Sequence, residues 1–190
     1  ADGAVRLWDP GSGATGRVLE GHIGGVRSVC AVRVGGRELL ASAGDDGTVR
    51  LWDPGSGATE RVLKGRTGWV LSVCAVRVGG RELLASAGAN GAVRLWDPGS
   101  GATERVLKGH TDGVRSVCAV RVGGRELLAS AGDDRTVRLW DPAMKSRPIV
   151  VGTSVPALSV APFSGGLFIG LSTGVLALRL DGIKPDQPMR

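Results

Sequence analysis

The chain has 190 residues and a formal net charge of +6, and apolar residues make up 42% of it. This composition is enough for one packed domain and argues against general disorder. No apolar run approaches the ~20 residues of a membrane-spanning helix, and three Cys cannot all pair. Both a transmembrane protein and a disulfide-stabilised secreted module are therefore disfavoured, and we expect a cytoplasmic protein without a membrane partner.

A long internal repeat dominates the sequence. Residues 21–64 differ from residues 65–108 at only seven of 44 positions. Four Trp-Asp pairs recur at the same 44-residue spacing, beginning at Trp8, Trp52, Trp96 and Trp140. A period of about 40–45 residues with Gly-His and Trp-Asp landmarks is typical of a four-stranded β-propeller blade.

Short strands alternate with Gly, Asp and Pro turns in every repeat. The first full repeat predicts strands a to d, from the inside of the blade outwards, over residues 26–32, 38–43, 48–53 and 61–64. A truncated blade precedes it, with strands c and d over 4–9 and 17–20. A degenerate blade ends the chain, with strands a, b and c over 157–161, 167–171 and 175–180 and with Leu180-Asp181 at the Trp-Asp position. The predicted units are 1–20, 21–64, 65–108, 109–152 and 153–181, followed by a flexible tail at 182–190.

These strands total 17, one more than four complete blades would need. We expect an all-β, incomplete arc of a larger ring, truncated at its N-terminal side. The alternative is a compact four-bladed ring with one redundant strand. Because an open arc exposes two blade faces that a ring buries, the chain should pair with a missing N-terminal half or a second copy, or aggregate.

The landmarks resemble those of the WD40-repeat family. The matching motifs are Gly21-His22, Gly109-His110, the four Trp-Asp pairs, and the b–c turns Asp45-Asp46-Gly47 and Asp133-Asp134-Arg135. They recur in register over residues 1 to about 181. The near-identical, Arg-rich repeats are similar to those of bacterial WD40 proteins, whose propellers are often fused to signalling or NTPase modules. The resemblance implies a propeller of four-stranded antiparallel blades.

Two repeats carry a Ser, a His and an Asp that could be taken for a hydrolase triad. A structural role is favoured, because a catalytic triad would not be duplicated at a 44-residue spacing. The resemblance to WD40 blades implies that these side chains and the Trp of strand c form a buried hydrogen-bonded tetrad. The predicted tetrads are His22, Ser42, Asp46 and Trp52, and His110, Ser130, Asp134 and Trp140.

The middle repeat has lost both ends of this set. It has Arg66 in place of His and Asn90 in place of Asp, whereas Ser86 and Trp96 remain. A lone buried Asp without its His would be costly, so the joint loss is physically coherent. Two explanations account equally well for this pair of changes. One is neutral drift in a single copy, and the other is that this blade no longer has the structural role of its neighbours.

Six of the seven differences between the first two full repeats fall near the d–a loop or in the b–c turn, which share one rim of a propeller. The flanking repeats can form charge pairs there, whereas the middle repeat has apolar residues, and exposed Trp is enriched in binding hot spots. The resemblance to WD40 domains implies partner contacts at these positions. The predicted partner-binding residues are Trp69, Leu71, Ala89, Arg66, Arg27, Asp45, Arg115 and Asp133. The alternative is that Trp69 folds over its own blade to fill the space of the lost His.

Neither a metal site nor a cofactor site is expected. Cys30, Cys74 and Cys118 lie mid-strand, one per blade and without a CxxC spacing, which is typical of small apolar residues in a core. No GxxxxGK[ST] phosphate loop is present, and the many Gly residues are placed in turns.

The Arg residues recur once per blade beside acidic neighbours, Arg50, Arg94 and Arg138 among them. This pattern predicts a solvated, self-compensating surface and not a nucleic-acid-binding face. The sequence thus favours a non-catalytic protein-protein interaction scaffold for a protein or peptide. The alternatives are a half-propeller without independent function and, less favoured, an enzyme built on a propeller frame.

Overall fold

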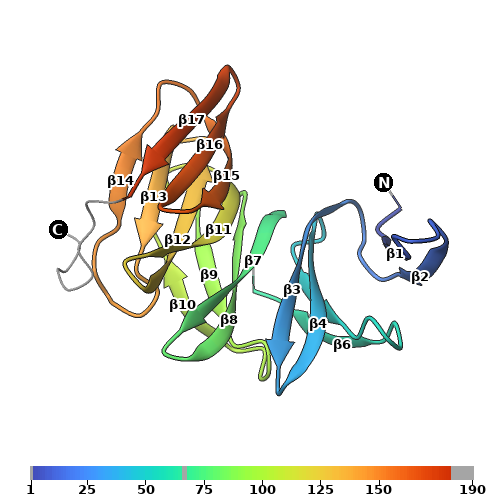
Figure 1. The fold of residues 1–190 in the computed structure, drawn as a ribbon. Helices are drawn as coiled ribbons and strands as arrows, with labels where there is room; N and C mark the ends of the chain where they lie inside the picture. The colour runs from blue at the N-terminus through green and yellow to red at the C-terminus, as the bar shows by residue number, and fades with distance from the viewer. Residues whose placement is uncertain (1, 66–67, 181–190) are drawn as a thin grey trace.

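The computed structural model describes residues 2–65 and 68–180, which form 17 β-strands in five antiparallel sheets (Figure 1). A two-stranded hairpin comes first, and three four-stranded blades follow it. A three-stranded sheet ends the described chain. The prediction of an all-β propeller arc built of four-stranded antiparallel blades is confirmed.

The hairpin consists of β1 (Val5–Trp8) and β2 (Thr15–Leu19). The first blade comprises β3 (Val26–Val34), β4 (Arg37–Gly44), β5 (Val49–Trp52) and β6 (Thr59–Leu63). The middle blade comprises β7 (Val70–Val78), β8 (Arg81–Gly88), β9 (Val93–Trp96) and β10 (Thr103–Leu107). The third blade comprises β11 (Val114–Val122), β12 (Arg125–Gly132), β13 (Thr136–Trp140) and β14 (Ile149–Gly152). The last blade comprises β15 (Ala157–Phe163), β16 (Gly166–Leu171) and β17 (Gly174–Arg179).

A glycine pair makes the tight turn between the first two strands of each four-stranded blade. In the first blade Val34 pairs with Arg37, and the two residues between them, Gly35 and Gly36, have φ angles of 57° and 81°. Two-residue hairpin loops with positive φ at both positions match the twist of the flanking strands, and glycine adopts them without strain. The repeated Val-Gly-Gly-Arg sequence therefore sets the register of each blade.

The hydrophobic core is divided into three clusters, each lying between two neighbouring blades. Between the first and middle blades, Leu39 and Ala41 pack in one cluster with Val73, Leu84 and Trp96. A blade thus buries its two faces against the blades before and after it, as expected for a repeat architecture in which each unit contacts only its neighbours.

The arc is open at both ends. The β1–β2 hairpin and β17 lie at opposite ends of the molecule, and the described strands do not close into a ring (Figure 1). The alternative of a compact four-bladed ring is therefore not the arrangement that the structure adopts.

The predicted alignment of the last blade was wrong at its third strand. Leu167 pairs with Leu178 as Leu40 pairs with Trp52, so Leu178 and not Leu180 takes the Trp position. The turn before β17 is one residue shorter than in the repeats, and without a Trp the sequence offers no landmark for the shift. Asp181 and the predicted tail at 182–190 lie outside the described residues.

Most strand boundaries differ from the predicted ones by one or two residues. The fourth strands start two residues early, at Thr15 and Thr59 and not at residues 17 and 61. In the first blade Thr59 pairs with Trp52 across an irregularity in the ladder, which lets the strand extend beyond the regular register. Among the described residues, no helix has the length and apolar character needed to cross a membrane.

Candidate functional site

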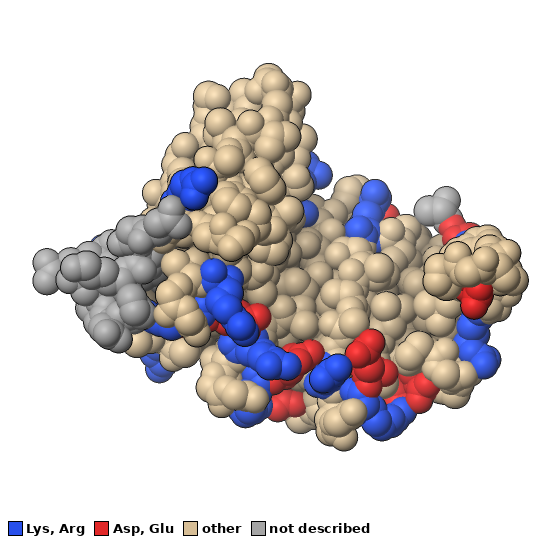
Figure 2. All heavy atoms as spheres, in the orientation of Figure 1, with Lys and Arg blue, Asp and Glu red and all other residues tan. Residues whose placement is uncertain are grey.

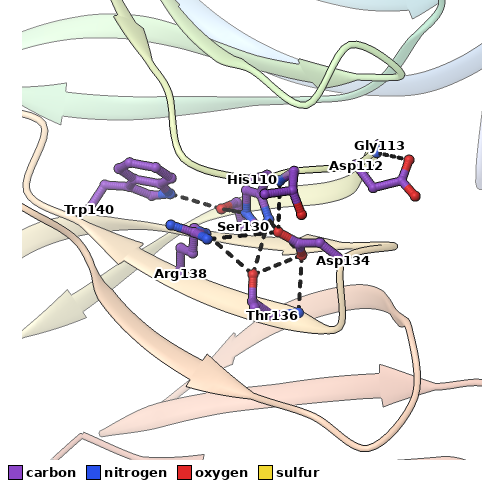
Figure 3. A network of polar contacts seen from close by, with 9 residues as sticks. His110, Asp112, Gly113, Ser130, Asp134, Thr136, Arg138 and Trp140 are labelled. Carbon is purple, nitrogen blue, oxygen red and sulfur yellow. Dashed lines mark hydrogen bonds and ion pairs between the residues drawn. The ribbon is translucent and has the colours of Figure 1, made fainter.

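The third blade contains a chain of hydrogen bonds that runs from its core to its rim (Figure 3). The Trp140 indole N–H donates to Ser130 Oγ at 2.8 Å, and Ser130 Oγ lies 2.8 Å from His110 Nε2. On the other side of the imidazole, His110 Nδ1 lies 2.9 Å from both Asp134 carboxylate oxygens. The four side chains come from β12, β13, the turn between them and the loop before β11.

When Asp134 is ionised and His110 is neutral, only one pattern of donors satisfies every link. An indole N–H can only donate, so Ser130 accepts from Trp140 and donates its own proton to His110 Nε2. The neutral imidazole then donates from Nδ1 to Asp134. Burial lowers the pKa of His110 against the opposing effect of Asp134. Burial also opposes the ionisation of Asp134, but hydrogen bonds from His110 and Thr136 outweigh it and lower the pKa of this carboxyl.

The first blade repeats the arrangement. Trp52 donates to Ser42 Oγ at 2.7 Å, Ser42 Oγ lies 2.7 Å from His22 Nε2, and His22 Nδ1 lies 3.0 Å from Asp46. The structure therefore brings together all the residues of both predicted tetrads, across the same elements in the two blades.

The order of contacts, from Ser to His to Asp, matches that of a hydrolase triad. However, Ser42 and Ser130 have no solvent exposure, and each already receives an indole N–H. A nucleophile must reach the substrate, and these hydroxyls have no route to one. What the arrangement can do is hold the b–c turn and the d–a loop against the blade core.

Two further groups belong to this network, and sequence reasoning assigned neither of them to it. The hydroxyl of Thr136 donates to Asp134 at 2.8 Å, and Thr48 does the same to Asp46 at 2.8 Å. The middle blade has Ala92 at this position, so the Thr is lost together with the His and the Asp. This joint loss in one repeat is the sequence feature from which the role of the Thr could have been predicted.

The arginines that precede each buried Trp were also misassigned. Arg50 and Arg138 were predicted to lie on a solvated surface, but their side chains are only 18% and 14% exposed. The Arg50 guanidinium lies 5.9 Å from the centroid of the Trp52 ring, and its Nε lies 3.9 Å from Asp46. The apolar stem of Arg allows such burial, and the cation gains from the indole face and the carboxylate.

Other arginines do lie on the charged surface that the sequence predicted. Arg37 pairs with Asp53 and Glu60, and the middle blade repeats this contact between Arg81 and its two acidic partners. Figure 2 shows basic and acidic side chains interspersed along the lower edge of the arc.

In the middle blade, the Trp–Ser part of the network persists. Trp96 donates to Ser86 Oγ at 2.8 Å, and Ser86 is fully buried. Asn90 is exposed on the b–c turn, where its side-chain oxygen accepts from the Ala92 N–H at 3.3 Å. Arg66, the predicted replacement for the His, lies outside the described residues.

The rim of the middle blade carries an exposed indole. Trp69 is 53% exposed, and the Arg27 guanidinium of the first blade lies 5.7 Å from the centroid of its ring. Arg27 is held in turn by Asp45, through hydrogen bonds of 2.7 Å from Nε and Nη2 to the two carboxylate oxygens. Beside the indole, the exposed Ala89 donates its N–H to the Trp69 carbonyl at 3.1 Å.

The remaining predicted rim residues lie on both sides of this group. Leu71 is half-buried on β7, and the Arg115–Asp133 ion pair of the third blade has a contact of 2.8 Å. A Cβ at Gly113 would lie 3.2 Å from Asp133 and 3.7 Å from the Ala89 backbone, so this pair borders the middle blade. The described part of the predicted epitope therefore forms one continuous strip across three blades.

The cysteines lie partly buried on the inner strands as free thiols. Burial raises the pKa of Cys30 and Cys118 to about 12, and it raises that of Cys74 well above its usual range. The thiols are therefore protonated at neutral pH and are poor nucleophiles and metal ligands. Among the described residues, no group of three or more His, Cys, Asp or Glu could hold a metal ion.

Comparison with protein families identifies three consecutive repeats in the chain. The family described as WD domain, G-beta repeat (WD40) matches residues 13–53, 57–97 and 101–141. Each match starts before a fourth strand and ends at the Trp-Asp pair of the next blade, so the sequence repeat is offset from the structural blade. A search of curated proteins finds no significant match. The three repeats and the blades that they form show that this chain belongs to the WD40-repeat family.

Proposed function

We propose that the chain is a non-catalytic scaffold that binds a protein or peptide on the rim of the middle blade, with Trp69 at the centre of the contact. WD40 repeat domains are commonly protein-interaction scaffolds. The observation that carries the proposal is the position of the Trp69 indole, which is 53% exposed while three other Trp of the repeats are buried.

The surroundings of Trp69 are those of a binding hot spot. Arg27 is stacked on the ring and is itself fixed by Asp45, so the indole is held in place before a partner arrives. A side chain that is already ordered loses little conformational entropy on binding, and Trp in such settings contributes ~2 kcal/mol or more. Within each nearby ion pair, the Arg and Asp charges neutralise each other. The indole, Ala89 and Leu71 therefore remain to contact an apolar side chain of the partner.

A second candidate function, hydrolysis by the Ser–His–Asp set, has less support. The serine hydroxyls are fully buried and committed to the indoles, and the same set occurs in two blades. A binding role needs no such access, because the strip on the rim is already at the surface.

The proposal is tested with the double variant Trp69→Ala/Leu71→Arg, used as bait for partner capture from lysate of the source organism. We expect the variant to fail to capture the proteins that the wild-type chain captures. Its melting temperature should stay within about 2 °C of the wild-type value, because neither change disturbs the core. Ile23→Ala is the matched control, since Ile23 is an exposed apolar residue on the same rim of the first blade. Unchanged capture with an unchanged melting temperature would refute the epitope. Lower stability with intact capture would instead favour a packing role for Trp69.

A further inference from the structure

The structure contains one blade-to-blade joint three times. In each joint, a Ser on the inner strand of one blade accepts a hydrogen bond from a Val N–H on the inner strand of the next. The pairs are Ser28 with Val73 at 3.1 Å, Ser72 with Val117 at 3.1 Å, and Ser116 with Val160 at 3.2 Å. The same joint contains the apolar cluster between the two blades.

One half of this joint is uncovered at the C-terminal end of the arc. We call it the trailing face and define it by Ser159, Phe168 and Val175 of the last blade. The strand pairings place Phe168 at the position of Ala41 and Val175 at that of Val49 in the first blade. Ala41 and Val49 are 0% and 1% exposed, whereas Phe168 and Val175 are 46% and 70% exposed.

The other half is uncovered on the first blade. We call it the leading face and define it by Val26, Val29 and Leu40. Val29 is 50% exposed, while its counterparts Val73 and Val117 are each 4% exposed. The β1–β2 hairpin supplies only the two outer strands of a preceding blade, so among the described residues nothing covers this inner part of the first blade.

The two faces are complementary in composition. No charged residue occurs between Arg147 and Arg179, so the only charged residue of the last blade is Arg179, at the end of β17 where it pairs with Gly166. Figure 2 shows almost no charged side chain over β15–β17 on the side in view. On β16, the Leu-x-Ala-x-Ala pattern of the trailing side becomes Gly-x-Phe-x-Gly, which moves apolar volume to the centre of the face and does not remove it.

We propose that two copies of this chain join head to tail, with the trailing face of each copy packed on the leading face of the other. Ser159 then accepts from the Val29 N–H of the second copy, as the other inner-strand serines accept from the next blade. The interface continues a contact between inner strands that the chain already makes three times, with Phe168 supplying the apolar volume at its centre.

The fourth strand of the last blade comes from the second copy in this arrangement. β17 takes the place of β1 beside β2, in the register that β5 has beside β6. This pairing sets Leu176 opposite Val18, where β1 offers Arg6. β1 is easily displaced, because Trp8 on this strand is 59% exposed while the corresponding Trp52 is 1% exposed.

Ring size favours two copies over other numbers. Each copy contributes three complete blades, and each joint completes one more, so two copies make a ring of eight blades. Propellers have about four to eight blades, which excludes rings of three copies. A ring of one copy would need the two ends to meet, and they lie at opposite ends of the arc (Figure 1).

The first test is the mass of the 190-residue chain in solution, measured by light scattering during gel filtration at tens of micromolar. We expect a single species of twice the 19.5 kDa chain mass. A one-chain mass, or a mass that grows with concentration as in an open filament, would overturn the proposal.

Two charge variants test the head-to-tail arrangement. Val29→Arg and Phe168→Glu each place a charge at the centre of one face, and each variant alone should have the one-chain mass with an unchanged β-sheet circular dichroism spectrum. Mixed in equal amounts, they should regain the two-chain mass, because one joint is then wild type and the other pairs Arg with Glu. If either substitution impairs folding, Val29→Lys and Phe168→Asp serve for the same mixing test.

The matched controls are Ile23→Arg on the first blade and Val150→Glu on β14 of the third blade. Both side chains are exposed and apolar but lie away from the joint, so both variants should keep the two-chain mass. A back-to-back dimer through the trailing faces would leave Val29→Arg dimeric and would give no recovery on mixing. Either of these results would overturn the head-to-tail joint.

Discussion

The middle blade and the two blades beside it have nearly the same sequence, yet they use the same positions differently. In the first and third blades, a buried His joins a Ser to an Asp, and a Thr hydroxyl supports the carboxylate. In the middle blade, the rim instead displays the Trp69 indole beside Ala89, while the Trp–Ser hydrogen bond below it persists. The comparison indicates that a blade needs only the inner part of the network to fold, which leaves its rim free to vary.

Breaking the network in a blade where it is complete should destabilise the chain most. His110→Ala should lower the free energy of unfolding by about 3 kcal/mol, because it leaves Ser130 and Asp134 without their partner inside a buried network. Chemical denaturation of the wild type and the variant measures the difference. Asp134→Asn in the same background should cost less than it does alone, since the two residues act as one unit. Simple additivity would contradict the idea that the middle blade lost them together.

Rebuilding the network in the middle blade should stabilise the chain. The triple variant Arg66→His, Asn90→Asp and Ala92→Thr should raise the free energy of unfolding by about 1–2 kcal/mol, which corresponds to the added hydrogen bonds. The reverse exchange in the first blade, His22→Arg, Asp46→Asn and Thr48→Ala, should lower it. A rebuilt blade that is no more stable than the wild type would show that other contacts in the middle blade already replace the lost hydrogen bonds.

Mild acid should weaken the third blade through the His110 imidazole. Burial holds the pKa of His110 below its ordinary value of 6.5, so the unfolded chain binds a proton more readily than the folded one. The contribution of His110 to the free energy of unfolding is therefore fully present above pH 6.5. It declines as the pH falls below this value, by no more than about 1.4 kcal/mol per pH unit. Denaturation between pH 7.5 and 5 measures the slope. His110→Gln should flatten it, and an equal slope in that variant would assign the effect to other groups.

The arginines that link neighbouring blades at their outer edge should contribute least to stability. Arg61 donates to the carbonyls of Gly99 and Ser100 in the next blade, at 2.6 and 3.1 Å. Arg61→Ala should cost about 1 kcal/mol, because these exposed bonds exchange with water. Arg33→Ala, on a salt bridge whose partners are both largely exposed, is the control and should cost less. Equal losses of unfolding free energy in the two variants would mean that Arg61 stabilises the chain only through its charge and not through these two hydrogen bonds.

Most of the fold could be predicted because its signals are local and repeated. The 44-residue period, the Gly-Gly turns and the Trp-Asp landmarks were enough for the number and order of the strands. The misassigned features depend on what a side chain contacts. The sequence predicts Arg50 as a surface residue, and only the structure shows its guanidinium over the Trp52 ring. Leu178 takes the Trp position because the preceding turn is shorter. The stacking of Arg27 on Trp69 joins two blades, and no feature within one repeat predicts it.

A full exchange of the rim separates the structural role of the middle blade from its binding role. The variant carries the first-blade residue at all seven differing positions of the middle blade: Arg66→His, Thr67→Ile, Trp69→Gly, Leu71→Arg, Ala89→Asp, Asn90→Asp and Ala92→Thr. Its melting temperature and its capture of protein partners are compared with those of the wild type. We expect a higher melting temperature together with lost capture, because the blade gains the network and loses the epitope. Retained capture, or a lower melting temperature in a folded variant, would contradict it.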